Sequence, residues 1–177
     1  KIIIIGGSRG IGRAIAHTLL PSHQIVNISR SVPEFSHTNL SHHSCDVITG
    51  DLPEIDEADG LIYCPGSINL KPFKRLSLDD FRTDFEINVM GAIKAIQTYI
   101  PALSKSDSGS IVLFSTVATA LGMPFHASIA TAKSAVEGLT KSVAADLAPN
   151  IRVNAIAPTI TQTDLAAKLL RNEKMVE

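Results

Sequence analysis

The sequence has no tryptophan and only two cysteines, and its acidic and basic residues nearly balance, leaving a formal net charge of −1. A charge this small gives no reason to expect nucleic acid or an anionic membrane as a partner. Because Cys45 and Cys64 form no CxxC pair, they predict neither a disulfide framework nor a metal site. Free thiols suit a reducing compartment, so we expect a cytoplasmic protein without a bound metal.

A long apolar run is also missing. The run from Ile2 to Ile5 ends at Gly6, which makes it too short for a membrane span or a signal peptide. Hydrophobic residues make up 45% of the chain and charged residues 19%, as in folded globular proteins. We expect one domain over residues 1–177. Since the chain starts inside an apolar run and stops inside a helical pattern, we also expect it to lack the C-terminal end of a longer protein.

Strand-like and helix-like segments alternate along the chain. Apolar, β-branched runs predict strands at 1–5, 24–29, 43–47, 59–64, 110–115 and 151–158. Helical periodicity predicts helices at 11–20, 77–103 and 124–149, with another beginning at 163. This alternation predicts an α/β fold, a doubly wound parallel sheet with helices on both faces, as in the Rossmann fold.

The segment GGSRGIG follows the first predicted strand and opens the first predicted helix. Its glycines, Gly6, Gly10 and Gly12, allow a tight turn through which the backbone can approach a phosphate closely. The helix that follows presents free N–H groups and the positive end of its dipole to that phosphate. The alternative is a glycine turn without a ligand, which the strand–loop–helix context makes less favourable.

The glycine spacing, GxxxGxG, resembles that of the short-chain dehydrogenase/reductase family, and further motifs follow in family order. They are CDV at 45–47, YCPG at 63–66, INVMG at 87–91, IVLFST at 111–116, AKSAVEGL at 132–139 and PTITQTD at 158–164. The last resembles the family's Pro-Gly-x-x-x-Thr loop, with Thr159 in the glycine position. The resemblance implies a nicotinamide dinucleotide held by Gly6, Ser8, Arg9, Gly10, Ile11, Gly12, Ser29, Arg30, Asp46, Val47, Cys64, Gly66, Asn88, Lys133, Pro158, Ile160 and Thr163.

The end of the second predicted strand bears on the choice of dinucleotide. A carboxylate there would bind the ribose 2′-OH of NAD, but the sequence has Ser29 and Arg30. Arg9 lies in the glycine loop, and two guanidinium groups near one ribose favour a 2′-phosphate. We expect NADP rather than NAD, the alternative being that both arginines are ordinary surface charges.

The resemblance also implies catalytic roles for Asn88, Ser115 and Lys133. In the family a tyrosine four residues before the lysine donates the proton, and here that position holds Ile129. Loss of a general acid typically lowers the rate by about 10²–10⁴. His126 is spaced to share a helix face with Ile129 and Lys133, and it is either a replacement acid or a helix-start residue without a role.

Two functions therefore remain open. The first is an NADP-dependent oxidoreductase that transfers a hydride between the nicotinamide and a small carbonyl or alcohol substrate. The second is a protein of the same family that binds NADP as a sensor or structural partner but has lost catalysis. The retained Ser115 favours the enzyme. The resemblance further implies a homodimer or homotetramer built through the long helices 77–103 and 124–147.

Overall fold

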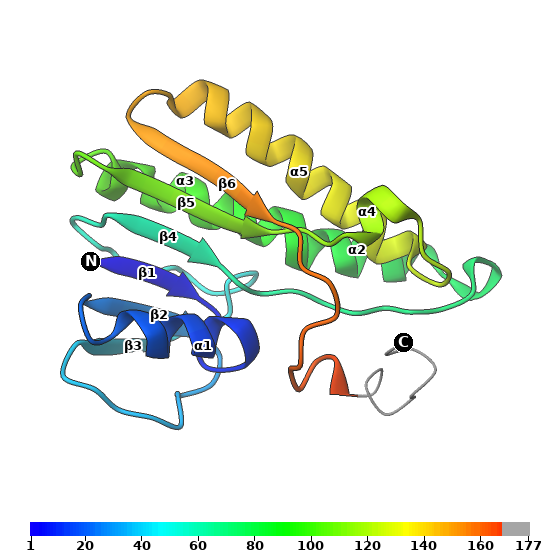
Figure 1. Cartoon of the computed structure of the whole chain (residues 1–177), viewed down its shortest axis with the longest axis horizontal. Helices are drawn as coiled ribbons and strands as arrows, with labels where there is room; N and C mark the ends of the chain where they lie inside the picture. The colour runs from blue at the N-terminus through cyan, green and yellow to red at the C-terminus, as the bar shows by residue number, and fades with distance from the viewer. Residues whose placement is uncertain (168–177) are drawn as a thin grey trace.

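The structure, a computed structural model, describes residues 1–167, in which six parallel strands form one sheet (Figure 1). The strands are β1 (Ile2–Ile5), β2 (Ile25–Ser29), β3 (Leu40–Ser44), β4 (Gly60–Tyr63), β5 (Gly109–Phe114) and β6 (Ile151–Ile156). Their order in the sheet is β3-β2-β1-β4-β5-β6. The predicted doubly wound parallel sheet is confirmed.

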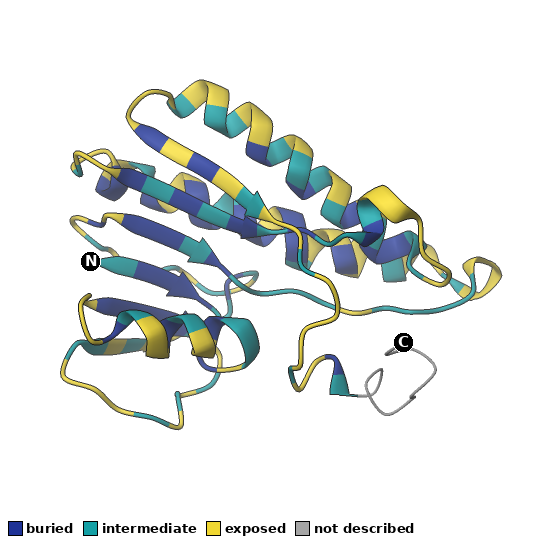
Figure 2. Ribbon diagram, viewed as in Figure 1, coloured by how far each residue is buried: buried dark blue, intermediate teal, exposed yellow. Residues whose placement is uncertain are grey.

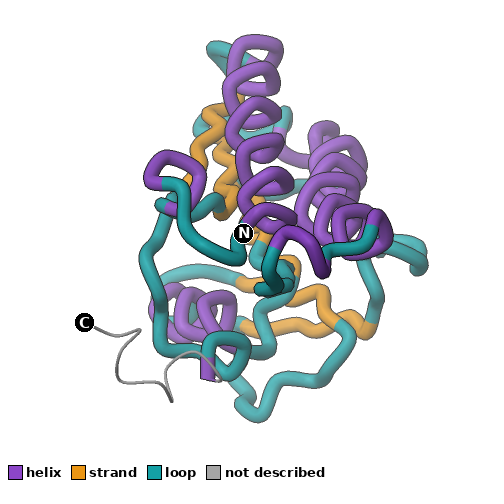
Figure 3. The backbone as a smooth tube through the Cα atoms, turned by 90° about the vertical axis from the view of Figure 1, so that its right-hand side faces the viewer, coloured by secondary structure: helices purple, strands orange, loops and turns teal. Residues whose placement is uncertain are grey.

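Helices pack on both faces of the sheet, as the view turned by 90° shows (Figure 3). They are α1 (Gly10–Leu19), α2 (Leu78–Phe85), α3 (Gly91–Leu103), α4 (Ala118–Leu121) and α5 (Ala127–Leu147), with short η1 (Phe73–Arg75) and the π-helical turn η2 (Glu86–Met90). The core cluster on one face joins the sheet to α3 and α5, and a smaller cluster on the other face joins it to α1.

The burial of the strands follows from their places in the sheet (Figure 2). The central strands β1 and β4 are buried along most of their length, because helices cover both of their faces. The edge strand β6 instead alternates buried and exposed residues over its first four positions. In β1, the side chains of Ile3 and Ile5 enter the larger core cluster, whereas Ile4 enters the smaller one.

The predicted helix over 77–103 is a succession of α2, η2 and α3. Its start is confirmed by a capping box, in which the Ser77 hydroxyl accepts from the Asp80 N–H and the Asp80 carboxylate accepts from the Ser77 N–H. In the middle, the Tyr63 hydroxyl donates a hydrogen bond of 2.6 Å to the carbonyl oxygen of Ile87. A Cβ on Gly91 would lie 2.1 Å from that hydroxyl, so the approach requires glycine.

Three predicted boundaries are wrong. The strand predicted at 43–47 lies earlier, at Leu40–Ser44, because this segment pairs residue by residue with all of β2. The helix predicted from 124 begins at Ala127, since Phe125 has a φ of +69°, which no α-helical residue adopts. The helix predicted from 163 starts later: residues 163–166 form a bend and a turn, residue 167 is helical, and the rest of the predicted helix lies outside the described residues.

The carboxyl ends of β1 and β4 are neighbours in the sheet, although two strands separate them in the sequence. The chain leaves β1 toward α1 on one face, and the crossover after β4 runs on the other face through α2 and α3. A crevice outside the strand ends therefore opens at this point, where doubly wound sheets bind ligands. Within residues 1–167, none of the helices has the length and apolar character needed to cross a membrane.

Candidate functional site

The glycine loop after β1 has the conformation that its sequence predicts. Gly6 and Gly10 have φ angles of +81° and +52°, which disfavour any residue with a side chain. A Cβ on Gly12 would lie 2.3 Å from the carbonyl oxygen of Gly6, so the loop can pack against α1 only with glycine there. The loop thus brings the backbone to the first turn of α1.

The N-terminus of α1 is open to a ligand. Its N-cap residue, Arg9, makes no side-chain hydrogen bond to the helix, and the first turn contains no acidic residue. The free N–H groups and the positive end of the dipole therefore remain available to an anion.

A cavity of about 420 Å³ lies beside this loop. Its lining includes eight of the predicted cofactor residues, namely Gly6, Ser8, Arg9, Ser29, Arg30, Asp46, Val47 and Gly66. Three more, Gly10, Ile11 and Thr163, line a hollow on the other side of the loop, where a Cβ on Gly10 would lie 3.4 Å from Thr163 Cγ2. An open helix N-terminus with a glycine cradle and this cavity fits the adenosine and diphosphate part of a dinucleotide.

A buried polar cluster holds the end of β2 against the glycine loop. Asn27 is fully buried, its Oδ1 accepts from the N–H of Gly7 at 2.9 Å, and its Nδ2 donates to Ser8 and Ser29 at 3.1 Å. The Ser8 hydroxyl lies within hydrogen-bond distance of the Ser29 hydroxyl and of the Ser31 carbonyl. Sequence reasoning missed Asn27, although a polar residue inside the apolar run IVNIS could have indicated it.

The arginines predicted for a 2′-phosphate lie at the rim of the cavity. Arg30 is exposed and forms a long ion pair of 3.9 Å with Asp46, which follows β3. Arg9 is also exposed and lines the same cavity. Both side chains are therefore free to turn toward an anion in the cavity.

Lys133 and Asn88 lie at the other end of the crevice, on the same side of Gly66. A Cβ on Gly66 would lie 3.4 Å from Asn88 Oδ1 and 3.7 Å from Lys133 Nζ. Lys133 Nζ donates a hydrogen bond of 2.8 Å to the carbonyl oxygen of Phe114, the last residue of β5. Asn88 is buried in η2, and its Oδ1 has no hydrogen-bond partner among the described residues. This orphaned acceptor beside a lysine suits a polar ligand or a water.

Burial changes the proton affinities of two groups here. Desolvation lowers the pKa of Lys133 to about 8, while electrostatic interactions with Cys64 and Asp84 act in the opposite direction. Burial also raises the pKa of the Cys64 thiol to about 12, with Lys133 opposing the rise. Cys64 is thus a neutral thiol near pH 8.

The hydroxyl of Ser115 does not face the crevice freely. Ser115 is buried, and its hydroxyl donates to Glu137 Oε1 on α5, which also accepts from Thr119 at 2.8 Å. The next residue, Thr116, is half-buried, and its Oγ1 accepts from the N–H of Ala118 at 3.3 Å. Among residues 1–167 the Thr116 hydroxyl donates to no acceptor, so of the two hydroxyls only that of Thr116 keeps a proton for another partner.

A signal for this difference was present in the sequence. Ile111, Leu113 and Ser115 alternate along β5 with period two, and all three are buried. The period therefore puts Ser115 on the core face and Thr116 on the other face.

Ile129 is 6% exposed on the first turn of α5, one turn before Lys133. His126 is the N-cap residue of α5, and its Nδ1 lies 2.7 Å from the carbonyl oxygen of Pro124. The interpretation of His126 as a helix-start residue therefore gains support. Of the C-terminal loop, the Pro158 carbonyl accepts from Val117 N–H at 3.3 Å, and the side chain of Ile160 is exposed.

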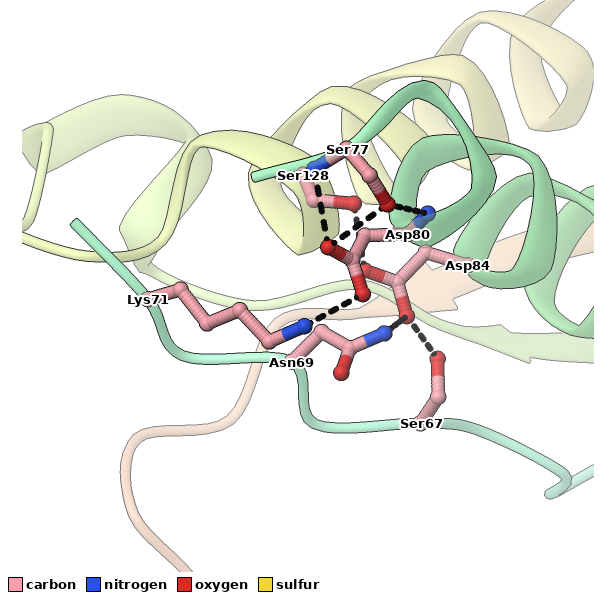
Figure 4. A network of polar contacts seen from close by, with 7 residues as sticks. All are labelled: Ser67, Asn69, Lys71, Ser77, Asp80, Asp84 and Ser128. Carbon is pink, nitrogen blue, oxygen red and sulfur yellow. Dashed lines mark hydrogen bonds and ion pairs between the residues drawn. The ribbon is translucent and has the colours of Figure 1, made fainter. Parts of the chain in front are cut away.

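Sequence reasoning also missed Asp84, a buried residue of α2 whose polar contacts Figure 4 shows. Its carboxylate accepts hydrogen bonds from the side chains of Ser67, Asn69 and Ser128. A polar residue four positions before Asn88, on the face that α2 buries, was the available signal.

The chain was compared with known proteins. The family model for short chain dehydrogenases matches residues 41–174. A cyclopentanol dehydrogenase of Comamonas testosteroni is 30% identical over 190 residues, which cover 96% of this chain and 76% of that protein.

Solved structures resemble the whole described fold. The ligand-free aldohexose dehydrogenase of Thermoplasma acidophilum superposes with a TM-score of 0.86 at 27% identity, over 100% of this chain and 73% of its own. ElxO with NADP bound has a TM-score of 0.82 at 26% identity, over 97% and 78% of the two chains.

Proposed function

The chain belongs to the short-chain dehydrogenase/reductase family of oxidoreductases, and we propose that it transfers a hydride between NADP and a small carbonyl or alcohol substrate. One observation carries the proposal: the crevice joins a cavity at the glycine loop, which fits the adenosine and diphosphate part of a dinucleotide, to Lys133 and Asn88 at its other end. A protein that merely held the diphosphate would not need a lysine and an amide converging there.

The choice of NADP rests on the end of β2. Ser29 stands there, and Arg9 and Arg30 flank the cavity. A 2′-phosphate would gain charge-assisted hydrogen bonds from the arginines. The end of β2 carries no acidic residue. The nearby carboxylate of Asp46 follows β3 instead and is paired with Arg30.

The chemistry divides between the cofactor and the chain. When bound, the nicotinamide supplies or accepts the hydride. Lys133 is positioned to hold the sugar that carries the nicotinamide, and Asn88 presents a free acceptor on the same side of Gly66. A hydroxyl donor must reach the substrate oxygen as negative charge builds on it, and the contacts favour Thr116 over Ser115 for this role.

The second candidate function is a cofactor sensor without catalysis. Two observations favour it: the buried Ile129 offers no proton, and the Ser115 hydroxyl is engaged by Glu137. The free hydroxyl of Thr116 and the lysine beside the crevice weigh against it.

We also propose a cytoplasmic homodimer or homotetramer. Three large apolar side chains on the helical stretch 78–103, Leu78, Phe85 and Met90, are exposed by 72%, 40% and 43%, which supports a subunit contact through these helices. The cysteines are free, in keeping with a reducing compartment.

The test is binding followed by turnover, with the full-length protein. NADPH and NADH are titrated by fluorescence, and oxidation of the preferred one is then followed with cyclic ketones, aldoses and simple aldehydes. We expect tighter binding of NADPH and slow turnover on some carbonyls. Tight binding without turnover across the panel would favour the sensor, and no binding of either nucleotide would refute both functions.

A further inference from the structure

Asp84 is an unusual acidic residue in this molecule. Within residues 1–167 it is the one charged side chain that is completely buried. Its Oδ1 accepts from Ser67 at 2.5 Å and from Asn69 at 3.3 Å, and its Oδ2 accepts from Ser128 at 2.6 Å (Figure 4). Three side-chain donors therefore bind the two oxygens of this one carboxyl group.

No cation neutralises this carboxylate directly. Asp80, one turn earlier on α2, is paired with Lys71 at 2.7 Å, whereas Asp84 forms no ion pair with any described residue. Burying an unpaired charge is costly unless a charge elsewhere in the site compensates it. A nearby positive charge is therefore the natural counterpart of Asp84.

Asn88 connects Asp84 to the crevice. Its Nδ2 donates to the Asp84 carbonyl at 2.7 Å and to the Ser67 hydroxyl at 3.0 Å. Its Oδ1 and Lys133 Nζ lie on the same side of Gly66, 3.4 and 3.7 Å from the position that a Cβ on that glycine would take. Asn88 thus contacts the buried Asp84 through its Nδ2, while its Oδ1 shares the space beside Gly66 with the ammonium group of the half-buried Lys133.

Lys133 has unused donors. Its one hydrogen bond within the described residues goes to Phe114, so two of the three N–H groups of the ammonium are free. One turn earlier stands Ile129, whose side chain is shorter than a tyrosine and has no hydroxyl. A substrate oxygen can therefore approach the ammonium more closely than a tyrosine at this position would allow.

We propose that Lys133 is the proton donor and acceptor of this site, and that Asp84 is the buried counter-charge through which it performs this role. The proposal rests on the proposed oxidoreductase function and extends it. In carbonyl reduction, the carbon gains the hydride and the C=O π pair moves onto oxygen. That oxygen takes one proton from the ammonium, which becomes a neutral amine and recovers a proton from solvent. Alcohol oxidation runs the same transfers in reverse.

The electrostatics agree with this role. Desolvation lowers the pKa of Lys133 to about 8, and the two groups that oppose the decrease are Cys64, after β4, and Asp84, on α2. Since burial raises the pKa of the Cys64 thiol to about 12, that thiol carries no charge near pH 8, and Asp84 supplies the opposing charge. An acid with a pKa near the working pH is well suited to donate and recover a proton.

The first experiment measures the lysine itself, without turnover. Lysines of the full-length, unloaded protein are dimethylated with ¹³C and titrated by NMR, and the Lys133 signal is assigned by its loss in Lys133→Arg. We expect Asp84→Asn to move the Lys133 midpoint to lower pH by about one pH unit. Asp79→Asn, an exposed carboxylate on the same helix, is the matched control and should leave the midpoint in place. Equal Lys133 midpoints in Asp84→Asn and Asp79→Asn would contradict the role of Asp84 as a counter-charge.

The second experiment needs no substitution, so it stands even if Asp84→Asn fails to fold. The kcat/KM for carbonyl reduction is measured against pH with saturating NADPH, and Lys133 is titrated in the NADPH-loaded wild-type protein. We expect reduction to fall about tenfold per pH unit above the Lys133 midpoint. If the pH at which kcat/KM begins to fall differs from the Lys133 titration midpoint by more than about one pH unit, the donor role is overturned while the oxidoreductase function stands. NADPH binding without turnover, in the wild type and in Ile129→Tyr, would refute the oxidoreductase and the donor role together, and the NMR titration would then decide the coupling alone.

Discussion

The hydroxyl of Ser115 donates a hydrogen bond to the carboxylate of Glu137, which lies one helical turn beyond Lys133 on α5. This contact ties the end of β5 to the helix that carries the lysine, and it occupies the proton that a substrate would need. The next residue, Thr116, has a hydroxyl proton that no described residue accepts. Of the two adjacent hydroxyls, that of Ser115 is bound within the protein and that of Thr116 is free to donate.

The two hydroxyls can be separated by a pair of substitutions. We expect Thr116→Val to lower carbonyl reduction by about a hundredfold, because the donor to the developing oxyanion is lost. Ser115→Ala should act mainly on the melting temperature and leave the rate within about threefold of wild type. Steady-state kinetics and thermal unfolding of both variants check this. If Ser115→Ala showed the large kinetic loss instead, Ser115 would be the catalytic hydroxyl.

Restoring a tyrosine at position 129 tests the missing acid. We expect Ile129→Tyr to raise reduction of simple ketones by about 10²-fold, since a positioned general acid contributes about that much. Ile129→Phe adds the same ring without the hydroxyl and should give no gain. Initial rates of NADPH oxidation are compared under identical conditions. An equal gain in both variants would attribute the effect to cleft shape rather than to proton donation.

The end of β2 should control the choice of dinucleotide. Ser29→Asp places a carboxylate where it can accept from a ribose 2′-OH and repel a 2′-phosphate. We expect the NADPH-to-NADH affinity ratio to fall roughly 10–100-fold. The 2′-phosphate would lose favourable charge contacts and be repelled by the new carboxylate, effects that together amount to a few kcal/mol. Ser104→Asp, at the exposed end of α3, is the control for added charge. An unchanged ratio would argue against recognition of a 2′-phosphate at this strand end.

Two tyrosines distinguish a structural hydrogen bond from one that also shapes the site. Tyr63 and Tyr99 each donate from a buried ring to a backbone carbonyl, of Ile87 in η2 and of Pro53 respectively. We expect Tyr63→Phe and Tyr99→Phe each to lower the free energy of unfolding by about 1–2 kcal/mol. Only Tyr63→Phe should also lower turnover, because η2 positions Asn88. Denaturant unfolding and kinetics on the same preparations provide the comparison.

Glu137 makes a pH-dependent contribution to stability. Hydrogen bonds from Ser115 and then Thr119 lower the pKa of its carboxyl group, so its folded-state value is below the unfolded one. The stabilisation by the Glu137 carboxylate is therefore present above the pKa that this group has in the unfolded chain. It is lost as the pH falls through the lower pKa that the group has in the folded protein. We expect the melting temperature of wild type to fall more steeply between about pH 5 and pH 3 than that of Glu137→Gln. Parallel curves would show that the carboxylate adds nothing to stability.

Much of the fold could be predicted from the sequence, because its signals are local. Four isoleucines, a glycine loop and an amphipathic segment in succession specify strand, turn and helix through backbone preferences and burial alone. The same holds for Lys133 and Ile129, whose spacing on one helix puts them on one face. Where boundaries were wrong, at β3 and at the start of α5, strand register and the backbone of Phe125 decided them.

The polar contacts of the site depended on tertiary structure. Asp84 accepts from Ser67 and Ser128, which lie 17 and 44 residues away in the sequence, and Ser115 reaches Glu137 across 22 residues. Residue types and spacing along the chain specify which groups are present, but a hydrogen bond forms only where folding brings donor and acceptor within about 3 Å. The sequence by itself therefore determined the parallel sheet, the glycine loop and the lysine. The packing of α2 and α5 against the strand ends decided which hydroxyl is free and which carboxylate is buried next to Asn88.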